Sequence, residues 1–371
     1  MKIGIITYHS AYNFGSMLQA FATQEAVKKM GHEAIILNYR MQSQKNFYAE
    51  YRTKYGKLNF LQDLCQLPMH NAKIERKQNY EKFFDEHFNL TAEFSEPEVM
   101  KEICKDFDVI ISGSDQIWNS RSCEFVNCDI EYMKPYLLDG FQGKKISYAS
   151  SIGHITDKEL EYIIPYVKKF DFLSVREQST KDRISKYIGK SIERVLDPTF
   201  LLTGDEWIEH LNLRKEENRP YILFYSLKRF DGNNILKEVI ELAHKKNMAV
   251  KYIMPFSYLP NIYKDVRNCE GFGPVEFMNA IYNSEMVITD SYHGTILSIN
   301  LNKNVYSLCS SGGAEFRKTE VLKRLGLENR VVHNVSDILD ADYEIKYENV
   351  NELLIKERIE SMRYLNEAIL S

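Results

Sequence analysis

The sequence predicts an α/β protein with two domains in series, and three observations lead to this fold class. The chain has 371 residues, which is too long for one typical hydrophobic core. In both halves, short β-branched or apolar runs alternate with segments that have the apolar spacing of an amphipathic helix. Polar residues repeatedly follow the predicted strands, as they do at the ligand-binding edge of a parallel sheet.

The composition is that of a globular protein and gives no global reason to expect a nucleic acid partner. The chain carries 48 Lys and Arg against 52 Asp and Glu, a formal net charge of -4. Its six cysteines lack CxxC spacing, and no signal peptide is recognised, so we expect a reducing, cytoplasmic setting. No apolar run approaches the roughly 20 residues of a membrane span, so any membrane contact would be peripheral.

The first domain is expected to cover residues 1–203, ending near the helix-breaking Pro198. Its predicted strands are Lys2–Thr7, Glu33–Asn38, Asp108–Ile111, Ile146–Ala149, Phe172–Val175 and Glu193–Leu196. Its predicted helices are Ser16–Met30, Ile74–His87, Asp157–Lys169 and Ser179–Ile188. Residues of about 41–100 form a helical insertion in this prediction. Basic and aromatic residues mix at 45–57 and suit sugar stacking or an anionic surface, or else a solvated helix whose rings reach the core.

The loop after the first strand has the position of a ligand-binding loop. It holds a single glycine, Gly15, so it lacks the glycine pattern of a dinucleotide-binding fingerprint. Ser16 and Gln19 fit a capping box that would start the helix at Ser16. Asn13, Gly15 and Ser16 are candidates to line a polar site, and the alternative is that Asn13 forms a turn and Ser16 only caps the helix.

Two further strand ends carry candidate site residues. After Asp108–Ile111, the polar residues Asp115, Gln116 and Asn119 crowd one loop, where Asp115 is either a base or hydroxyl-binding group or the cap of a turn. After the strand that ends at Val175, Arg176 either grips a carboxylate or phosphate or pairs with a structural acid such as Glu177.

The second domain is expected to cover residues 204–349 and to repeat the alternation. Its predicted strands are Tyr221–Ser226, Ala249–Met254, Val287–Thr289 and Val305–Leu308. Its predicted helices are Asn233–Lys246, Pro274–Asn283, one that opens near residues 292–295, and Glu315–Leu325. A final amphipathic helix, residues 350–371, is expected to cross back to the first domain.

The stretch from Met286 to Asn302 reads as a strand, a tight turn and a helix. The free N–H groups of that helix start favour an anion, and His293 stands where an anionic substrate is expected. Ser291, Gly294 and Thr295 complete this candidate site. The alternative is that Ser291 merely caps the helix and His293 is an ordinary turn histidine. Arg317 and Lys318 fall at the start of the next helix, where cations are unfavourable unless an anion lies nearby.

Five motifs together make the chain resemble the polysaccharide pyruvyl transferase family over most of its length. They are YNFGSMLQ from Tyr12, DVIISGSDQIWN from Asp108, SVRE from Ser174, VLDPT from Val195 and TDSYHGT from Thr289. The resemblance implies two Rossmann-like domains facing a cleft, in a GT-B-like glycosyltransferase architecture. It also implies transfer of the pyruvyl group of phosphoenolpyruvate to a sugar diol as a ketal.

By this resemblance, Arg176, His293 and Arg317 or Lys318 would meet the donor. Phosphoenolpyruvate carries a phosphate and a carboxylate, which suits several cations and the helix start at Gly294. We expect His293 to donate a proton or steady the phosphate, and Asp115 to deprotonate or orient a hydroxyl.

The expected partners are phosphoenolpyruvate and a sugar acceptor, on a polysaccharide or its lipid-linked precursor, at the inner face of the membrane. We expect no metal, cofactor or nucleic acid, and the oligomeric state stays open. The rival hypothesis is a glycosyltransferase with a nucleotide-sugar donor, since helix starts cradle diphosphates equally well. A non-catalytic sugar- or anion-binding protein is the hypothesis from another class.

Overall fold

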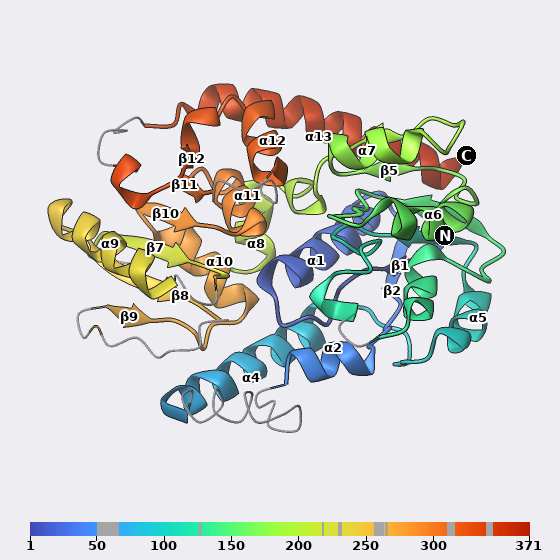
Figure 1. The fold of residues 1–371 in the computed structure, drawn as a ribbon, viewed down its shortest axis with the longest axis horizontal. Helices are drawn as coiled ribbons and strands as arrows, with labels where there is room; N and C mark the ends of the chain where they lie inside the picture. Colours follow the sequence, from blue (N-terminus) through green and yellow to red (C-terminus); the bar gives the residue numbers. More distant parts are fainter. Residues whose placement is uncertain are drawn as a thin grey trace. The chain divides into compact units, whose positions relative to one another are not determined.

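A computed structural model describes residues 1–49, 67–125, 128–216, 219–228, 232–255, 263, 266–309, 316–338 and 344–371. The chain divides into two compact units. The first comprises Met1–Ala49, Phe84–Leu202 and Ile355–Ser371, and the second Glu50–Phe83 and Thr203–Leu354 (Figure 1). The predicted insertion of about 41–100 is therefore divided between the units: its residues 67–83 belong to the second unit and its residues from Phe84 onward to the first. Most of the 45–57 segment lies outside the described residues.

The first unit is built on parallel strands. Its strands are β1 (Lys2–Ile6), β2 (Glu33–Ile36), β3 (Val109–Ser112), β4 (Lys144–Ser147), β5 (Ser174–Val175) and β6 (Glu193–Arg194). Its helices are α1 (Phe14–Lys29), α2 (Gln42–Phe47), α5 (Met100–Ile103), α6 (Asp157–Val167) and α7 (Gln178–Ser185). Its 3₁₀ helices are η3 (Pro97–Val99), η4 (Cys104–Asp106), η5 (Cys123–Phe125), η6 (Ile130–Leu137) and η7 (Pro198–Phe200).

The sheet order of the first unit is β2-β1-β3-β4, and β5 and β6 form a further parallel pair. Single bridges from Ile146 to Phe172 and from Ser150 to Val175 connect that pair to β4. The strand order reverses between β1 and β3, where Ile6 pairs with Ser112. Ligands of open α/β sheets bind at the carboxyl ends of the strands that flank such a reversal.

Helix α1 begins two residues earlier than the capping-box pattern predicted. Asn13 is its N-cap, because the Asn13 side chain accepts hydrogen bonds from the backbone N–H groups of Gly15 and Ser16. Ser16 is therefore inside the first turn. Gln19 Nε2 donates to Thr7 Oγ1 and to the carbonyls of Tyr8 and Ser16, which is not the reciprocal bond of a capping box. The prediction that Ser16 caps this helix was wrong. The Asn13 amide, three residues before the expected cap, satisfies the first N–H groups instead.

The second unit has a six-stranded parallel sheet. Its strands are β7 (Tyr221–Tyr225), β8 (Ala249–Ile253), β9 (Arg267–Asn268), β10 (Met286–Thr289), β11 (Asn304–Leu308) and β12 (Val331–Val332). Its helices are α8 (Gly204–His210), α9 (Gly232–Lys245), α10 (Pro274–Asn283), α11 (Tyr292–Asn300) and α12 (Phe316–Arg324). Its 3₁₀ helices are η2 (Leu67–Met69), η9 (Glu328–Arg330) and η10 (Val335–Ile338).

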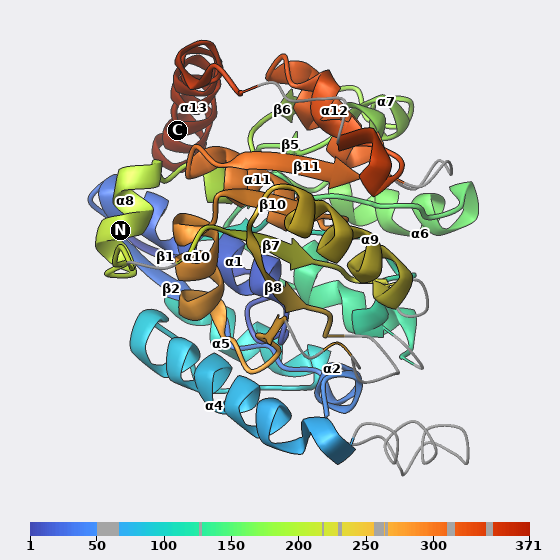
Figure 2. The same cartoon turned by 90° about the vertical axis from the view of Figure 1, so that its left-hand side faces the viewer.

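The strand order of this sheet is β12-β11-β10-β7-β8-β9, the doubly wound order of a Rossmann fold. Leu236, Val239 and Leu242 of α9 pack on one face of the sheet, against Ile222 and its neighbours. On the other face lie α10 and α11, and Figure 2 shows α9 and α10 on either side of β7 and β8. The order reverses between β7 and β10, so this unit has a second candidate ligand-binding edge.

Two helices contain residues of both units, α4 (His70–His87) and α13 (Tyr347–Leu370). Along α13, the Tyr347 hydroxyl donates to the Lys303 carbonyl in the second unit. In the first unit, Ser361 Oγ accepts from Leu196 N at 2.9 Å, and the Tyr364 hydroxyl donates to Ser147 O at 2.9 Å. The final helix thus has hydrogen bonds in each unit.

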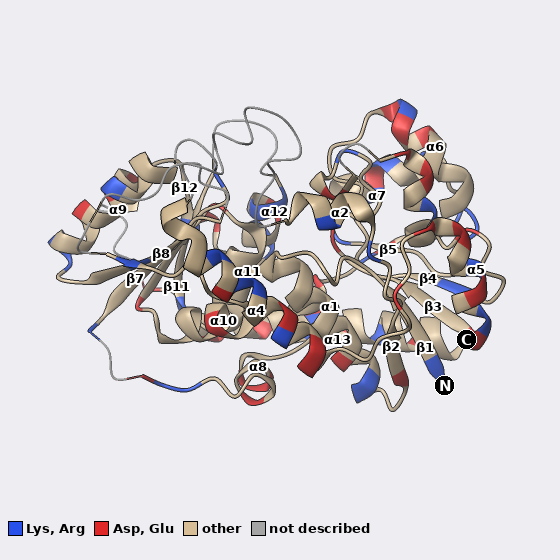
Figure 3. Cartoon of the chain, turned by 90° about the horizontal axis from the view of Figure 1, so that it is seen from below, with Lys and Arg blue, Asp and Glu red and all other residues tan. Residues whose placement is uncertain are grey.

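Charge is distributed without long blocks of one sign. Basic and acidic positions are interspersed along α4 and in the first half of α6 (Figure 3). Among the described residues, no helix combines the length and the apolar character needed to cross a membrane.

Candidate active site

The first candidate site lies at the strand reversal of the first unit, where the loops after β1 and β3 leave the sheet side by side. A Cβ atom on Gly113 would lie 2.9 Å from Cβ of Thr7, closer than real side chains approach. Glycine is therefore required for the two loops to run this close together. Thr7 Oγ1 donates to the Ser114 carbonyl at 2.9 Å and fastens them.

Asp115 is held rigidly at the centre of this edge. Its φ is +72°, a left-handed conformation that few residues other than glycine, asparagine and aspartate adopt. Oδ1 accepts from the backbone N–H of Gln116 at 2.8 Å, and Oδ2 accepts from the Ser16 hydroxyl at 2.8 Å. The carboxylate thus caps its own turn and also reaches the first turn of α1. Its role as a base or as a group that binds a substrate hydroxyl stays a prediction.

Gln116 and Asn119 interact with each other. Asn119 Nδ2 donates to Gln116 Oε1 at 2.8 Å, and the pair packs on Gly153. A Cβ on Gly153 would lie 2.3 Å from Gln116 Oε1, and Gly153 has a φ of +53°. The two amides therefore shape the rim of the site next to Asp115.

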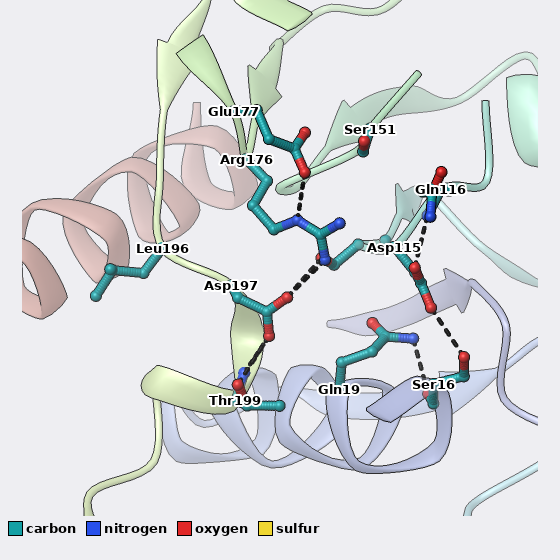
Figure 4. A network of polar contacts seen from close by, with 12 residues as sticks. Ser16, Gln19, Asp115, Gln116, Ser151, Arg176, Glu177, Leu196, Asp197 and Thr199 are labelled. Atoms are coloured by element: carbon teal, nitrogen blue, oxygen red, sulfur yellow. Dashed lines mark hydrogen bonds and ion pairs between the residues drawn. The ribbon is translucent and has the colours of Figure 1, made fainter. Parts of the chain in front are cut away.

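Arg176 is buried in a network of ion pairs (Figure 4). Its Nε donates to Glu177 Oε1 at 2.8 Å, and its Nη1 donates to Asp197 Oδ2 at 2.8 Å. The guanidinium group points toward the loop that carries Asp115. The structure shows Arg176 paired with structural acids, which is one of the two interpretations of this residue. A contact with a substrate phosphate or carboxylate stays a prediction.

The Val195–Thr199 motif serves the same network. Asp197 Oδ1 accepts from both the backbone N–H and the hydroxyl of Thr199, at 3.0 and 2.8 Å. Ser114 Oγ lies 3.5 Å from Asp197 Oδ2 and connects the network to the Asp115 loop. Asp197 orients Arg176, a role that its sequence position alone did not reveal.

The second candidate site lies at the strand reversal of the second unit, where Thr289 pairs with Tyr225. Asp290 follows β10, and its carboxylate accepts from Leu227 N at 2.8 Å and from the Ser226 hydroxyl at 2.5 Å. Burial raises the pKa of Asp290, while these two hydrogen bonds oppose that rise. Asp290 thus ties the carboxyl ends of β7 and β10 together. Ser226 was not predicted as part of the site.

Ser291, Gly294 and Thr295 build the start of α11. Ser291 is the N-cap and accepts from Gly294 N at 3.2 Å. A Cβ on Gly294 would lie 2.7 Å from Thr289 Oγ1, so this position requires glycine for close helix–strand packing. Thr295 donates to the Ser291 carbonyl at 2.9 Å and to Ser307 Oγ at 3.1 Å. These three residues form the frame of the site.

Three nitrogen-bearing side chains gather at this helix start. His293 lies in the first turn of α11 and is 9% exposed. Lys318 of α12 is 4% exposed, and its Nζ donates to the carbonyls of Asp290 at 2.8 Å and Leu308 at 2.5 Å. The Arg317 guanidinium stands 5.8 Å from the centre of the Tyr292 ring. The structure therefore places Arg317 and Lys318 beside the His293 turn, as an anion-binding site requires.

The predicted site residues thus fall into two sets. Asn13, Gly15, Ser16, Asp115, Gln116, Asn119 and Arg176 lie in the first unit, and Ser291, His293, Gly294, Thr295, Arg317 and Lys318 in the second. Each set surrounds the carboxyl edge of its own sheet. That Arg176 and His293 meet the same donor stays a prediction. Among the described residues, no group of three or more His, Cys, Asp or Glu side chains is arranged to hold a metal ion.

Two Rossmann-like α/β units define a fold of the GT-B glycosyltransferase type, and solved structures show the same fold. A UDP-GlcNAc 2-epimerase from Neisseria meningitidis, bound to UDP-GlcNAc, has a TM-score of 0.58 at 9% identity, with 100% of both chains covered. The Arabidopsis thaliana protein UGT89C1, complexed with UDP, has a TM-score of 0.53 at 10% identity, with 100% of this chain and 99% of that chain covered. A search of curated proteins gives no match.

The family of the chain follows from its sequence rather than from its fold. A family model of polysaccharide pyruvyl transferases matches residues 13–309, which include the first candidate site and the start of α11 but not Arg317 and Lys318. The chain belongs to the polysaccharide pyruvyl transferase family and is a transferase. The predicted fold class and family are thereby confirmed.

Proposed function

We propose that this protein transfers the pyruvyl group of phosphoenolpyruvate to two hydroxyl groups of a sugar, forming a cyclic ketal. The acceptor is a polysaccharide or its lipid-linked precursor, and we place the reaction at the cytoplasmic face of the membrane. Family membership supports the transfer of a pyruvyl group. The observation that carries the choice of donor is the gathering of His293, Arg317 and Lys318 at one helix start.

In this scheme the second unit binds the donor. Phosphoenolpyruvate presents a phosphate and a carboxylate, and the start of α11 offers backbone N–H groups and a partial positive charge. Arg317 and Lys318 add two formal charges within reach of the same turn. His293 donates the proton to the donor methylene group or steadies the phosphate.

The first unit binds the acceptor in this scheme. Asp115 accepts the proton of the attacking hydroxyl, or orients that hydroxyl, because its oxygens are fixed by Ser16 and Gln116. Arg176 remains our candidate for a further donor contact, with Glu177 and Asp197 fixing the direction of its guanidinium group. No step of the scheme calls on a metal or cofactor.

The reaction balances with these groups. The first hydroxyl oxygen bonds to the central carbon of phosphoenolpyruvate while the methylene carbon gains a proton and becomes a methyl group. The second hydroxyl oxygen then bonds to the same carbon as the C–O bond to phosphate breaks. The two hydroxyl groups lose two protons in total. One proton is matched by the proton that the methylene carbon gains, and the other is carried away by inorganic phosphate.

A nucleotide-sugar glycosyltransferase is the second candidate function, supported by the fold that the chain has in common with proteins bound to UDP-GlcNAc or UDP. Ligand-induced stabilisation separates the two. A ligand at 100 times its dissociation constant stabilises the protein that binds it by about 2.7 kcal/mol. We expect phosphoenolpyruvate to raise the melting temperature and UDP- and GDP-sugars to leave it unchanged.

Turnover is the second arm of the test. Phosphate release from phosphoenolpyruvate should depend on an added saccharide acceptor, and mass spectrometry should detect the pyruvyl ketal. Binding of phosphoenolpyruvate without turnover on any acceptor would favour the non-catalytic binding protein. Stabilisation by a nucleotide-sugar alone would overturn the proposal in favour of glycosyl transfer.

A further inference from the structure

Two tyrosine rings lie together beside the first candidate site. Tyr12 precedes Asn13 in the loop after β1, and Tyr48 follows the last turn of α2. Their ring centres are 6.2 Å apart with an interplanar angle of 46°, and both side chains are half-buried. The pair therefore presents aromatic surface close to the N-cap of α1.

A buried carboxyl group fixes one of these rings. The Tyr48 hydroxyl donates to Oε1 of Glu124 at 2.7 Å, and Glu124 is 2% exposed. The Ser43 hydroxyl donates to the Glu124 backbone carbonyl at 2.9 Å, which fastens α2 to η5. The orientation of the Tyr48 ring thus depends on Glu124.

The charge state of Glu124 suits this position. Burial raises the pKa of Glu124 to about 7, opposed by its contacts with Tyr48 and the Gln44 amide, while the charge on Asp115 raises it further. Within the described residues, no hydrogen bond of good geometry reaches Oε2 of Glu124. With a pKa of about 7 the carboxyl group is about half protonated at neutral pH, and its neutral form accepts the Tyr48 hydrogen bond without the cost of a full buried charge.

The tyrosine pair is connected to the loop that carries Asp115. The Ser10 hydroxyl donates to Gln44 Oε1 of α2 at 3.0 Å, and the Tyr8 hydroxyl donates to the Gln116 carbonyl at 3.3 Å. The loop after β1 therefore bridges α2 to the residue next to Asp115. A ring that stacks on the tyrosine pair would approach the edge where Asp115 lies.

We propose that Tyr12 and Tyr48 form a stacking platform for a pyranose ring of the acceptor, with Glu124 as the positioning residue that fixes Tyr48. This inference rests on the proposed function, because it assigns the sugar acceptor to the first unit. Pyranose rings have C–H faces that pack on aromatic rings, and both tyrosine rings are half-buried, so part of each ring is accessible. Of the basic and aromatic residues at 45–57, the proposal gives this role to Tyr48.

The direct test is sugar binding without the donor. Saturation-transfer NMR with methyl glycosides of galactose, glucose, mannose and N-acetylglucosamine, and with disaccharides of these sugars, should detect binding to the wild-type protein. Tyr48→Ala should weaken the Kd about tenfold, a loss of about 1.4 kcal/mol. Tyr48→Phe keeps the ring but loses the hydrogen bond to Glu124, so it should weaken the Kd about fivefold, the effect expected for the loss of Glu124.

The chain offers a matched control. Tyr162 of α6 lies 6.0 Å from Tyr166 at an interplanar angle of 43°, and its hydroxyl donates to Glu131 Oε1 at 2.8 Å. This is the same arrangement of two rings and one carboxyl group on a different element. Tyr162→Ala should leave sugar binding unchanged. Equal losses in Tyr48→Ala and Tyr162→Ala, or no sugar signal with the wild-type protein, would overturn the platform.

Steady-state kinetics then test Glu124. Glu124→Ala should raise the acceptor KM about fivefold, while kcat and the KM for phosphoenolpyruvate stay unchanged. Glu124→Gln should have the wild-type acceptor KM, because its amide oxygen still accepts the hydrogen bond from Tyr48. A fall in kcat without a change in acceptor KM would exclude the positioning role. Sugar binding that depends on Tyr48 in a protein without pyruvyl transfer would refute the proposed function and retain the platform.

Discussion

The hydroxyl group of Ser16 donates a 2.8 Å hydrogen bond to Oδ2 of Asp115, across 99 positions of sequence. This contact joins the first turn of α1 to the loop after β3. Because Asn13 caps the helix, the Ser16 side chain is available to bind the carboxylate. One carboxylate oxygen is thus oriented by the Ser16 hydroxyl, and the other by the backbone N–H of Gln116.

Asp115→Asn is predicted to lower kcat with little change in folding. The amide is nearly isosteric but cannot take a proton, and a positioned general base contributes roughly 10² to 10⁴ in rate. Ser16→Ala should lower kcat by less than tenfold, because Gln116 N still orients the carboxylate. Steady-state assays of phosphate release check both. A kcat for Asp115→Asn within a factor of three of wild type would remove Asp115 as the base.

Lys318→Met is predicted to raise the KM for phosphoenolpyruvate at least tenfold. A charge-assisted hydrogen bond contributes about 1.5 to 3 kcal/mol, and removing the ammonium group also leaves the carbonyls of Asp290 and Leu308 without their donor. Arg317→Met should raise the same KM without that structural cost, and isothermal titration with phosphoenolpyruvate measures both variants.

Lys323→Met is the control for these two changes, because Lys323 is an exposed cation in the last turn of the same helix. Its affinity for phosphoenolpyruvate should equal that of the wild type. If all three substitutions weaken binding equally, the effect is one of net charge, and the α11 start is not the donor site.

Arg176→Met is predicted to destabilise the protein by about 3 to 5 kcal/mol, because it leaves the buried acids Glu177 and Asp197 without their cation. Adding Asp197→Asn should recover part of this loss, which urea unfolding of both variants would show. Loss of activity in Arg176→Ala would therefore not identify a donor contact by itself. If Arg176→Met were as stable as wild type, the structural role of the network would be excluded.

The sequence was sufficient for the parts of the fold that depend on local pattern. The apolar β-branched run before Asp290 and the cap at Ser291 predicted a strand, a turn and a helix, and β10 and α11 follow in that order. The strands β9 and β12 were not predicted. β9 consists of two exposed polar residues, Arg267–Asn268, and β12 of two valines between polar residues, so neither stretch shows an apolar run or alternation. They exist because neighbouring strands supply the hydrogen bonds.

Partners that are distant in sequence could not be predicted. Asp197 follows Arg176 by 21 residues, and Glu124 lies 76 residues from Tyr48, so no local spacing indicates either contact. The Asn13 cap was hidden for another reason. Two residues, Asn13 and Ser16, both suit a helix start, and only the backbone conformation decides between them.

The stability of the protein is predicted to fall with rising pH through the ionisation of Glu124. Its pKa is about 7 in the folded protein, above the roughly 4.3 of an unfolded glutamate, so the folded state binds more protons between these values. As the pH rises from about 4.3 to about 7, the Glu124 carboxyl group ionises in the unfolded state but stays protonated in the folded state. At 1.36 kcal/mol per pKa unit, this costs about 3 to 4 kcal/mol of stability above pH 7.

Glu124→Gln should remove this dependence. Urea unfolding at about pH 4.5 and about pH 8.5 measures the free energy of unfolding of both proteins. Relative to the wild type, the variant should be more stable at the higher pH than at the lower pH by a few kcal/mol, because the raised pKa of Glu124 is absent from it. Glu131→Gln is the control. The contact with Lys134 lowers the pKa of the exposed Glu131, so ionisation of Glu131 favours the folded state and this variant should not gain on the wild type as the pH rises. Parallel pH profiles for wild type and Glu124→Gln would mean that the Glu124 carboxyl is already ionised at neutral pH. Tyr48 would then donate to a buried charge.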